Sequence, residues 1–283
     1  MRSTLKVWTG LGVATALVGA GLAGCAGENG EGGEGGEAGA EASIAGEGEG
    51  GEGEGGEGEA GPGDGEGGVA ADEAASDPVV YGAALAVVEA HAIAARDAYL
   101  VGQTEAAAEM FGHPVSEVLA DMAPVFDELG VADFTATLNE ASSAALKPDN
   151  SEAVEAAYEA ILSALEGASA KAPTGDMSKG AVAAGVVADQ IDRATTMYAK
   201  AAGTDIYEPY LDGYGFYKAA SAAFERSGAA VETYNSGLHS DIKAALGLLG
   251  DAYPSAERPA ALESDQGQLL GAASKVKLGL PAT

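Results

Sequence analysis

The chain has 283 residues, with 44 acidic residues against 14 basic ones and a formal net charge of −30 at pH 7. This balance argues against binding to nucleic acid or to anionic lipid headgroups and makes cations the natural partners, while solubility or a salty habitat is the alternative reason for the acidity. A single cysteine excludes a disulfide framework, so an exported domain of this chain must be stable through its own core.

Residues 1–24 have the order of a secretory signal peptide. Two cations, Arg2 and Lys6, precede a largely apolar run over residues 7–21, which is followed by Leu22-Ala23-Gly24-Cys25. The apolar run is shorter than the roughly 20 residues that a membrane span needs. We therefore predict a cleaved leader and not a lasting transmembrane helix.

The tetrapeptide Leu22-Ala23-Gly24-Cys25 resembles the lipobox of bacterial lipoproteins, whose cysteine receives a diacylglyceryl group before cleavage. The resemblance implies that Cys25 is lipidated and that two or three acyl chains hold the protein to a membrane, which a single myristoyl chain does not do stably. It also implies export, with the protein on the periplasmic side of a cell-envelope membrane or on the cell surface. The alternative is an ordinary secreted protein whose cysteine stands there by chance.

Residues 25–77 are predicted to comprise the lipidated Cys25 and an acidic linker that follows it. Residues 26–77 are dominated by Gly and Glu and hold 16 acidic residues with no basic or aromatic one. Such a segment buries too little to offset its ordering entropy, so we predict that it is disordered. As a Gly-rich coil it would average roughly 40 Å from end to end and act as a spacer. Loose collection of cations is the alternative, but isolated carboxylates between glycines give no fixed coordination geometry.

Residues 78–283 predict an all-α domain, folded as an up-and-down helical bundle. Alanine is abundant, strand-like alternation is nearly absent, and Gly or Pro interrupts the chain at helical lengths. The clearest helix begins at the cap Asn150 and ends at Gly167. An arrangement as two helical hairpin groups joined across residues 171–178 fits the short connections. The other helices are predicted near 79–101, 104–112, 114–129, 133–146, 180–201, 206–227, 229–250 and 259–274.

The three histidines are the first residues with ligand chemistry. His91 lies in an alanine-rich helix and is expected to face the core, whereas His239 lies in a polar setting and is expected on the surface. His113 precedes Pro114 and is the expected N-cap of the helix that Pro114 opens. Glu117 follows His113 by four residues, which places a carboxylate one turn from the imidazole. Imidazole and carboxylate are ligands of zinc, iron or copper, but Glu117 in a first turn also suits the helix dipole alone.

The segment from His91 to Ala120 resembles a histidine-containing helical hairpin of bacterial periplasmic proteins associated with the imelysin and EfeO-like iron-uptake proteins. The residues that carry this resemblance are His91, Gly102 and Gly112-His113-Pro114-Val115-Ser116-Glu117-Val118-Leu119. Glu208-Pro209-Tyr210-Leu211-Asp212-Gly213-Tyr214-Gly215-Phe216 is similar to a second signature of that group, Tyr-x-Asp-x-Tyr-Gly-Phe.

The resemblance implies a helical bundle in the cell envelope with a metal held by residues from different helices. Its matching candidates for metal ligands are His91, His113 and Glu117, with Asp212 as an additional one. The imelysin signature itself is His-x-x-Glu, and His113 and Glu117 are spaced differently, so the peptidase activity ascribed to that family is not supported here.

A second feature of the later segment is a run of tyrosines at helical spacing of three, four and three, namely Tyr207, Tyr210, Tyr214 and Tyr217. Such a stripe belongs to a core or to an interface, with each hydroxyl reaching a partner at the rim. On a regular helix Asp212 would point nearly opposite to Tyr210 and Tyr214. Either Asp212 serves a different face, or the glycines on both sides of Tyr214 distort the helix.

Three functions fit these features. The first is a membrane-tethered cell-envelope lipoprotein that binds a transition metal, iron or copper before zinc, for uptake or homeostasis. The second is a metal-free helical interaction module that presents its Tyr-rich face to another envelope protein. The third is a hydrolase in which His91, His113 and Glu117 hold a metal that activates water, but no general base or other hydrolase or nucleotide-binding signature stands out. A role without catalysis is therefore favoured.

Overall fold

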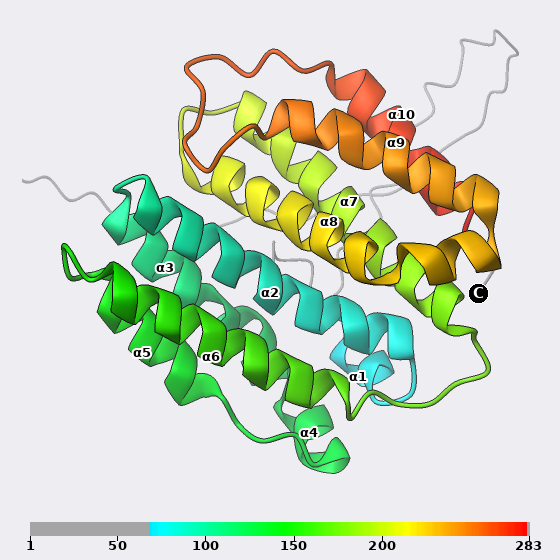
Figure 1. Cartoon of the computed structure of the whole chain (residues 1–283), viewed down its shortest axis with the longest axis horizontal. Coiled ribbons are helices and arrows are strands. Elements are labelled where there is room, and N and C mark those ends of the chain that lie inside the picture. Colours follow the sequence, from blue (N-terminus) through cyan, green and yellow to red (C-terminus); the bar gives the residue numbers. More distant parts are fainter. Residues whose placement is uncertain (1–67, 282–283) are drawn as a thin grey trace, which may run out of the picture. The chain divides into compact units, whose positions relative to one another are not determined.

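The computed structural model describes residues 68–281 and shows a helical bundle without β-strands among them (Figure 1). The all-α prediction is confirmed. The predicted signal peptide, Cys25 and the linker up to residue 67 lie outside the described residues. The helices are α1 (Ala71–Ala74), α2 (Pro78–Leu100), α3 (Thr104–Pro114), the π-helix η1 (Val115–Leu119), α4 (Ala120–Leu129), α5 (Thr135–Ala145), α6 (Ser151–Ser169), α7 (Lys179–Ala202), α8 (Glu208–Tyr234), α9 (Ser236–Ala252) and α10 (Gln266–Leu278).

The helices fall into two groups, α2 to α6 and α7 to α10, joined by the segment 170–178. Within the first group α2 packs against α3 and α6, and α5 packs against α3 and α6. Within the second group α7 packs along α8, and α9 and α10 cover this pair. The two groups meet where α2 lies against α7 and α8, as the central position of α2 in Figure 1 shows. Residues on α2 and α8 are therefore brought together although they are far apart in the sequence.

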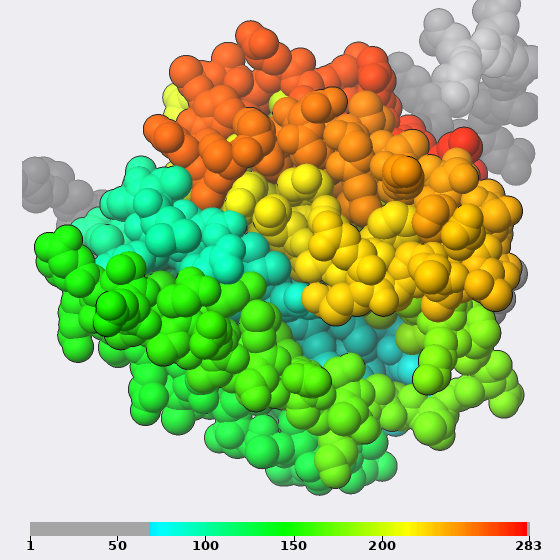
Figure 2. Space-filling view, viewed as in Figure 1, coloured from blue at the N-terminus to red at the C-terminus, as the bar shows by residue number. Residues whose placement is uncertain are grey.

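Helix α2 is the central helix of the bundle. It begins with Pro78 in its first turn, and the Asp77 carboxylate caps it by accepting the N–H groups of Val79 at 2.7 Å and Val80 at 3.3 Å. Among the described helices it is the one that is long and apolar enough to cross a membrane by length and composition alone. Because 72% of its most apolar window is buried inside the protein, this apolarity is that of a core helix. In Figure 2, cyan atoms of α2 show between the green and the yellow parts of the chain.

The folded part begins before Pro78, where the sequence pattern placed its start. Val69 and Ala74 are buried, α1 packs against α2 and α4, and the Arg193 guanidinium donates a 2.9 Å hydrogen bond to the carbonyl of Gly68. The residues from 68 to 77 therefore belong to the bundle and not to a spacer. The alternation of Gly and Glu ends before Val69, which leaves side chains that can pack.

The predicted helix start at Pro114 is wrong. Helices α3, η1 and α4 follow one another without a break, and Pro114 is the last residue of α3. Proline removes one backbone N–H and crowds the preceding turn, and the wider π-helical turn that begins at Val115 accommodates this defect. His113 is consequently an interior helical residue and not an N-cap.

Two other helix ends and one helix cap also differ from the pattern. Helix α6 passes Gly167 and ends at Ser169, while the Asn150 side chain donates to the carbonyl of Ala144 at 3.0 Å and does not cap the helix. Helix α8 passes Gly228 and ends at Tyr234. By contrast, Gly102 and Gly130 do follow helix ends. Their φ angles of 85° and 67° are left-handed, a conformation that favours glycine and that commonly ends a helix.

The last helix begins later than predicted because the chain before it is tied to α7. The Arg258 guanidinium donates to the carbonyls of Ala201 at 3.1 Å and Thr204 at 2.7 Å, at the end of α7. The Tyr198 hydroxyl accepts the N–H of Ser264 at 2.9 Å. These bonds hold residues 254–264 in an irregular path, and α10 starts only after the cap Asp265.

Candidate metal centre

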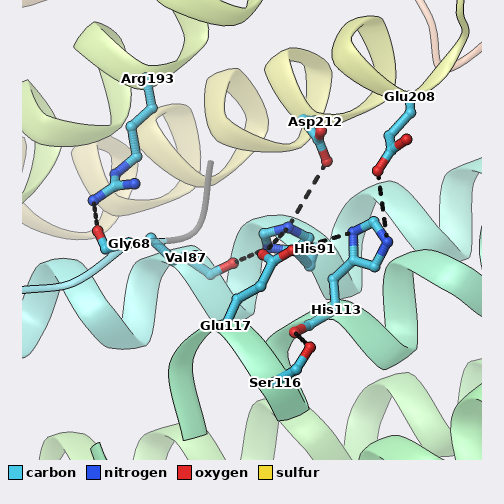
Figure 3. A network of polar contacts seen from close by, with 9 residues as sticks. All are labelled: Gly68, Val87, His91, His113, Ser116, Glu117, Arg193, Glu208 and Asp212. Carbon is cyan, nitrogen blue, oxygen red and sulfur yellow. Dashed lines mark hydrogen bonds and ion pairs between the residues drawn. The ribbon is translucent and has the colours of Figure 1, made fainter. Parts of the chain in front are cut away.

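Four side chains with metal-ligand chemistry meet where the two helical groups face each other (Figure 3). His91 comes from α2, His113 from α3, Glu117 from η1 and Asp212 from α8. These are the four residues named from the sequence, and the structure brings all of them together. His91 and Asp212 are buried, with 2% and 3% of their surface exposed, whereas His113 and Glu117 are partly exposed.

The spacing of the ligand atoms suits an ion. His91 Nε2 lies 3.6 Å from a Glu117 oxygen and 3.8 Å from Asp212 Oδ1, and His113 Nδ1 lies 3.9 Å from the other Glu117 oxygen. Ligand atoms of His91, His113 and Asp212 all lie within 4.8 Å of one another. These separations exceed hydrogen-bond length. They approach the roughly 3.4 Å between two ligands of a tetrahedral ion whose bonds are about 2.1 Å long.

The tautomer of His91 follows from its backbone contact. Nδ1 lies 2.8 Å from the carbonyl oxygen of Val87, one turn earlier on α2. Because a carbonyl only accepts, Nδ1 carries the hydrogen and donates it, and Nε2 is the atom that faces Glu117 and Asp212 (Figure 3). Metal-bound histidines are usually held in this way, with the second ring nitrogen bonded to a carbonyl or a carboxylate.

A glycine sets the distance between the helices that carry His91 and Asp212. A Cβ on Gly215 of α8 would lie 2.5 Å from the carbonyl oxygen of Ala90 and 3.0 Å from the Ala94 Cβ, so only glycine allows this approach of α8 to α2. Ala90 directly precedes His91, and Asp212 lies one turn before Gly215 on the same face. The close approach therefore delivers Asp212 to His91.

The orientation of Asp212 is decided by the regularity of α8. The helix runs from Glu208 to Tyr234 through both glycines that flank Tyr214. Asp212 thus serves a different face from Tyr210 and Tyr214. Phe216 lies on the Asp212 side, with its ring 5.7 Å from the His91 ring at 89°, and shields the imidazole from one edge.

Glu208 is a residue of this region that the sequence pattern did not single out. Its Oε1 lies 3.7 Å from His113 Nε2, on the side of the ring opposite to Glu117. Glu208 stands four residues before Asp212 on α8, so both carboxylates lie on one helix face. That spacing is the signal that would have found it.

The four tyrosines of the stripe do not form an exposed surface. Tyr210 and Tyr214 are buried, and Tyr207 and Tyr217 are partly buried. The hydroxyl of Tyr214 donates to Asp97 Oδ2 at 2.6 Å, and those of Tyr207 and Tyr210 donate to backbone carbonyls at 2.7 Å. Burial raises the pKa of Tyr207 to about 12, and the carboxylate of Glu257 adds to this rise. The packing of these rings fits the core alternative for the stripe, and a Tyr-rich face for a partner stays a prediction.

His239 lies on α9, outside the cluster. It is half-buried, and its ring lies 4.9 Å from the Phe224 ring. His239 is therefore less exposed than expected, because its ring packs against Phe224. In the described part of the chain no contact links it to His91 or His113.

No family model, curated protein or solved structure matches the chain. The likeness to the imelysin-associated proteins stays a prediction, and the geometry of the four side chains carries the functional argument.

Proposed function

We propose that this protein is a cell-envelope lipoprotein that binds a transition metal ion between His91, His113, Glu117 and Asp212, for uptake or homeostasis of the metal. The observation that carries the proposal is the orientation of His91. Its Nδ1 is committed to the Val87 carbonyl at 2.8 Å, and its Nε2 faces two carboxylates at 3.6 and 3.8 Å. A metal ion placed among these atoms would be bound by the imidazole and by both carboxylates.

The donor set suits a transition metal such as iron, copper or zinc. Two imidazoles and two carboxylates suit Fe, Cu(II) and Zn, whereas Cu(I) prefers sulfur ligands. Calcium takes six to eight oxygen ligands, which two carboxylates and two imidazoles do not supply. Two carboxylates also balance the charge of a divalent ion, which lowers the cost of holding it in a site that includes the buried His91 and Asp212.

Binding is favoured over catalysis if Glu117 joins the group of His91, His113 and Asp212, whose ligand atoms lie within 4.8 Å of one another. A fourth ligand would fill a tetrahedral site, as in structural metal centres, whereas catalytic zinc sites keep one position open for water or substrate. The ligands come from both helical groups, so a bound ion would hold α2, α3 and α8 together. This arrangement suits retention of the metal.

Calorimetric titration of residues 68–283 with Cu²⁺, Zn²⁺ and, without oxygen, Fe²⁺ tests the proposal. This segment omits most of the acidic linker, so its carboxylates do not contribute. We expect one tight site that is lost when His91→Ala and His113→Ala are combined. His239→Ala is the matched control because it removes a histidine outside the cluster, and it should leave affinity unchanged. Equal affinity in the double variant and the control would refute the site.

The membrane tether is tested separately from the metal. We expect labelled fatty acid fed to producing cells to be incorporated into the protein and to be absent from the Cys25→Ala variant. The variant should also leave the membrane fraction, because Cys25 is the attachment point of the predicted anchor. Membrane association that is unchanged by Cys25→Ala would rule out the lipoprotein assignment.

A further inference from the structure

Side-chain exposure increases from the buried ligands through His113 to Glu208, and Glu117 is itself 32% exposed. The side chains of His91 and Asp212 are each 2% exposed, that of His113 is 24% exposed, and that of Glu208 is 48% exposed. Glu208 is therefore the group that a cation arriving from solvent meets first on this side. His113 lies between it and the buried ligands (Figure 3).

The ring of His113 faces a carboxylate on each side. Nδ1 lies 3.9 Å from Glu117, toward the buried ligands, and Nε2 lies 3.7 Å from Glu208, toward solvent. A neutral imidazole has a single lone pair, which belongs to one nitrogen at a time. The residue therefore offers a ligand atom either to the inner position or to an outer one, according to its tautomer.

We propose that Glu208 and His113 Nε2 form an outer cation position that captures the metal and passes it to the inner site. This inference rests on the proposed function. Glu208 and Nε2 would hold the ion first, on the solvent side of the ring, and Nδ1 and Glu117 would hold it on the inner side.

The geometry of α8 makes this transfer short. Glu208 and Asp212 are four residues apart on one face of the helix. The rise between them is about 6 Å, one turn of helix. The ion would thus move from the Glu208 carboxylate to the Asp212 carboxylate while the His113 ring stays bound to it.

Two other roles for Glu208 make different predictions. As a first-turn residue of α8, it would act only on the helix dipole and affect stability. As an orienting partner of His113, it would support the inner ligand, and its loss would weaken affinity by faster release. A capture position instead lowers the barrier in both directions, so its loss slows loading and release together and leaves affinity nearly unchanged.

Stopped-flow loading of the full chain with Cu²⁺, and release of Cu²⁺ to excess chelator, separate these roles. In Glu208→Gln we expect both rate constants to fall by about tenfold, with an unchanged ratio, at the lower end of known electrostatic effects on loading. Glu208→Asp keeps the carboxylate and should recover part of the rate. Every variant carries the same linker and Cys25, so their contributions cancel in the comparison.

Glu152→Gln is the matched control, because Glu152 is also an exposed acidic residue in the first turn of a helix, α6. It should change neither rate. Unaltered loading in Glu208→Gln, or weaker affinity through faster release alone, overturns the capture position while the inner site stands. If Cu²⁺ binding by the full chain is insensitive to the combined His91→Ala and His113→Ala change, the proposed function fails, and the capture position fails with it.

Discussion

Helix α8 contributes to two polar clusters that are built in opposite ways. The tyrosine cluster is centred on Tyr253. The ring centroids of Tyr198, Tyr210 and Tyr217 lie 5.3 to 6.3 Å from that of Tyr253. Two hydroxyls of this cluster have hydrogen-bond partners inside the protein, since Tyr210 and Tyr253 each donate to a backbone carbonyl at 2.7 Å. The histidine cluster, composed of His91, His113, Glu117 and Asp212, instead has N to O separations of 3.6 to 3.9 Å.

The tyrosine cluster is held by short hydrogen bonds, whereas the histidine cluster has the longer spacing that the proposed metal site needs. A buried hydroxyl bonded to a carbonyl satisfies both partners and leaves no position for a third atom. Nitrogen and oxygen atoms held about 3.7 Å apart leave space for an ion between them. Substitutions in the tyrosine cluster should therefore cost stability, and substitutions in the histidine cluster should cost metal binding.

The largest expected effect is in the tyrosine cluster. Tyr253 is 1% exposed and contacts the rings of Tyr198, Tyr210 and Tyr217. Tyr253→Ala should lower the free energy of unfolding by about 3–5 kcal/mol through the cavity it leaves. Tyr253→Phe keeps the ring and should cost about 1 kcal/mol, for the lost bond to the Ala194 carbonyl. Urea denaturation measures both, and equal costs would mean that the ring packing contributes little.

The next effect belongs to the histidine cluster. A metal at one hundred times its Kd should raise the free energy of unfolding by about 2.7 kcal/mol, because it binds the folded state alone. For a domain of this size that corresponds to a rise of roughly 5–10 °C in Tm. Asp212→Asn should abolish most of this rise. Thermal scans with and without metal test it, and a full metal-dependent rise in Asp212→Asn would show that the ion binds elsewhere.

A substitution between the two clusters should affect both properties. Gly215→Ala places a Cβ against the Ala90 carbonyl and should destabilise the fold by about 1–3 kcal/mol through overpacking. It should also weaken metal affinity, because it moves Asp212 away from His91. Gly247→Ala in α9 is the control, since a Cβ there meets nothing within 4 Å. That change should stabilise the protein by roughly 0.5–1 kcal/mol through helix propensity and leave metal affinity unchanged. Unchanged metal affinity in Gly215→Ala would show that the close approach is not required for binding.

The smallest effect is a loss of stability at alkaline pH that comes from buried tyrosines. The pKa of Tyr207 is raised to about 12 by burial, against about 10 in an unfolded chain. Folding therefore favours the protonated phenol, so this contribution is complete below pH 10 and is lost as pH rises toward 12. The unfolding free energy of Tyr207→Phe should fall less steeply than that of the unsubstituted protein between pH 10 and 12. Identical slopes would mean that Tyr207 ionises as freely in the folded protein as in the unfolded one.

Much of the fold could be predicted because its signals are local. The alanine-rich runs, the Asp77-Pro78 helix start and the left-handed Gly102 depend on residues adjacent in the chain. The same holds for His113 and Glu117, whose spacing places them one turn apart in any helix. These features follow from backbone hydrogen bonds and sterics, which the nearest residues dictate.

Other features depended on partners distant in the sequence, and they were decided only by tertiary packing. Gly167 and Gly228 were interpreted as helix ends, yet both helices continue past them. Ala168 and Val231, which follow these glycines, are buried, so packing extends both helices. Pro114 read as a start, yet a π-helix carries the chain through it. The inward direction of Tyr210 and Tyr214 depended on which faces of α8 were covered by the loop after α9 and by α2.

The candidate site divides in the same way. The sequence by itself determined the chemistry of the donors, His91, His113, Glu117 and Asp212, and the one-turn spacing of His113 and Glu117. Only the tertiary structure brought α8 alongside α2, where the missing Cβ of Gly215 allows a close approach. The physical reason is that helix formation is local, whereas the distance between ligands on different helices is set by packing across both helical groups.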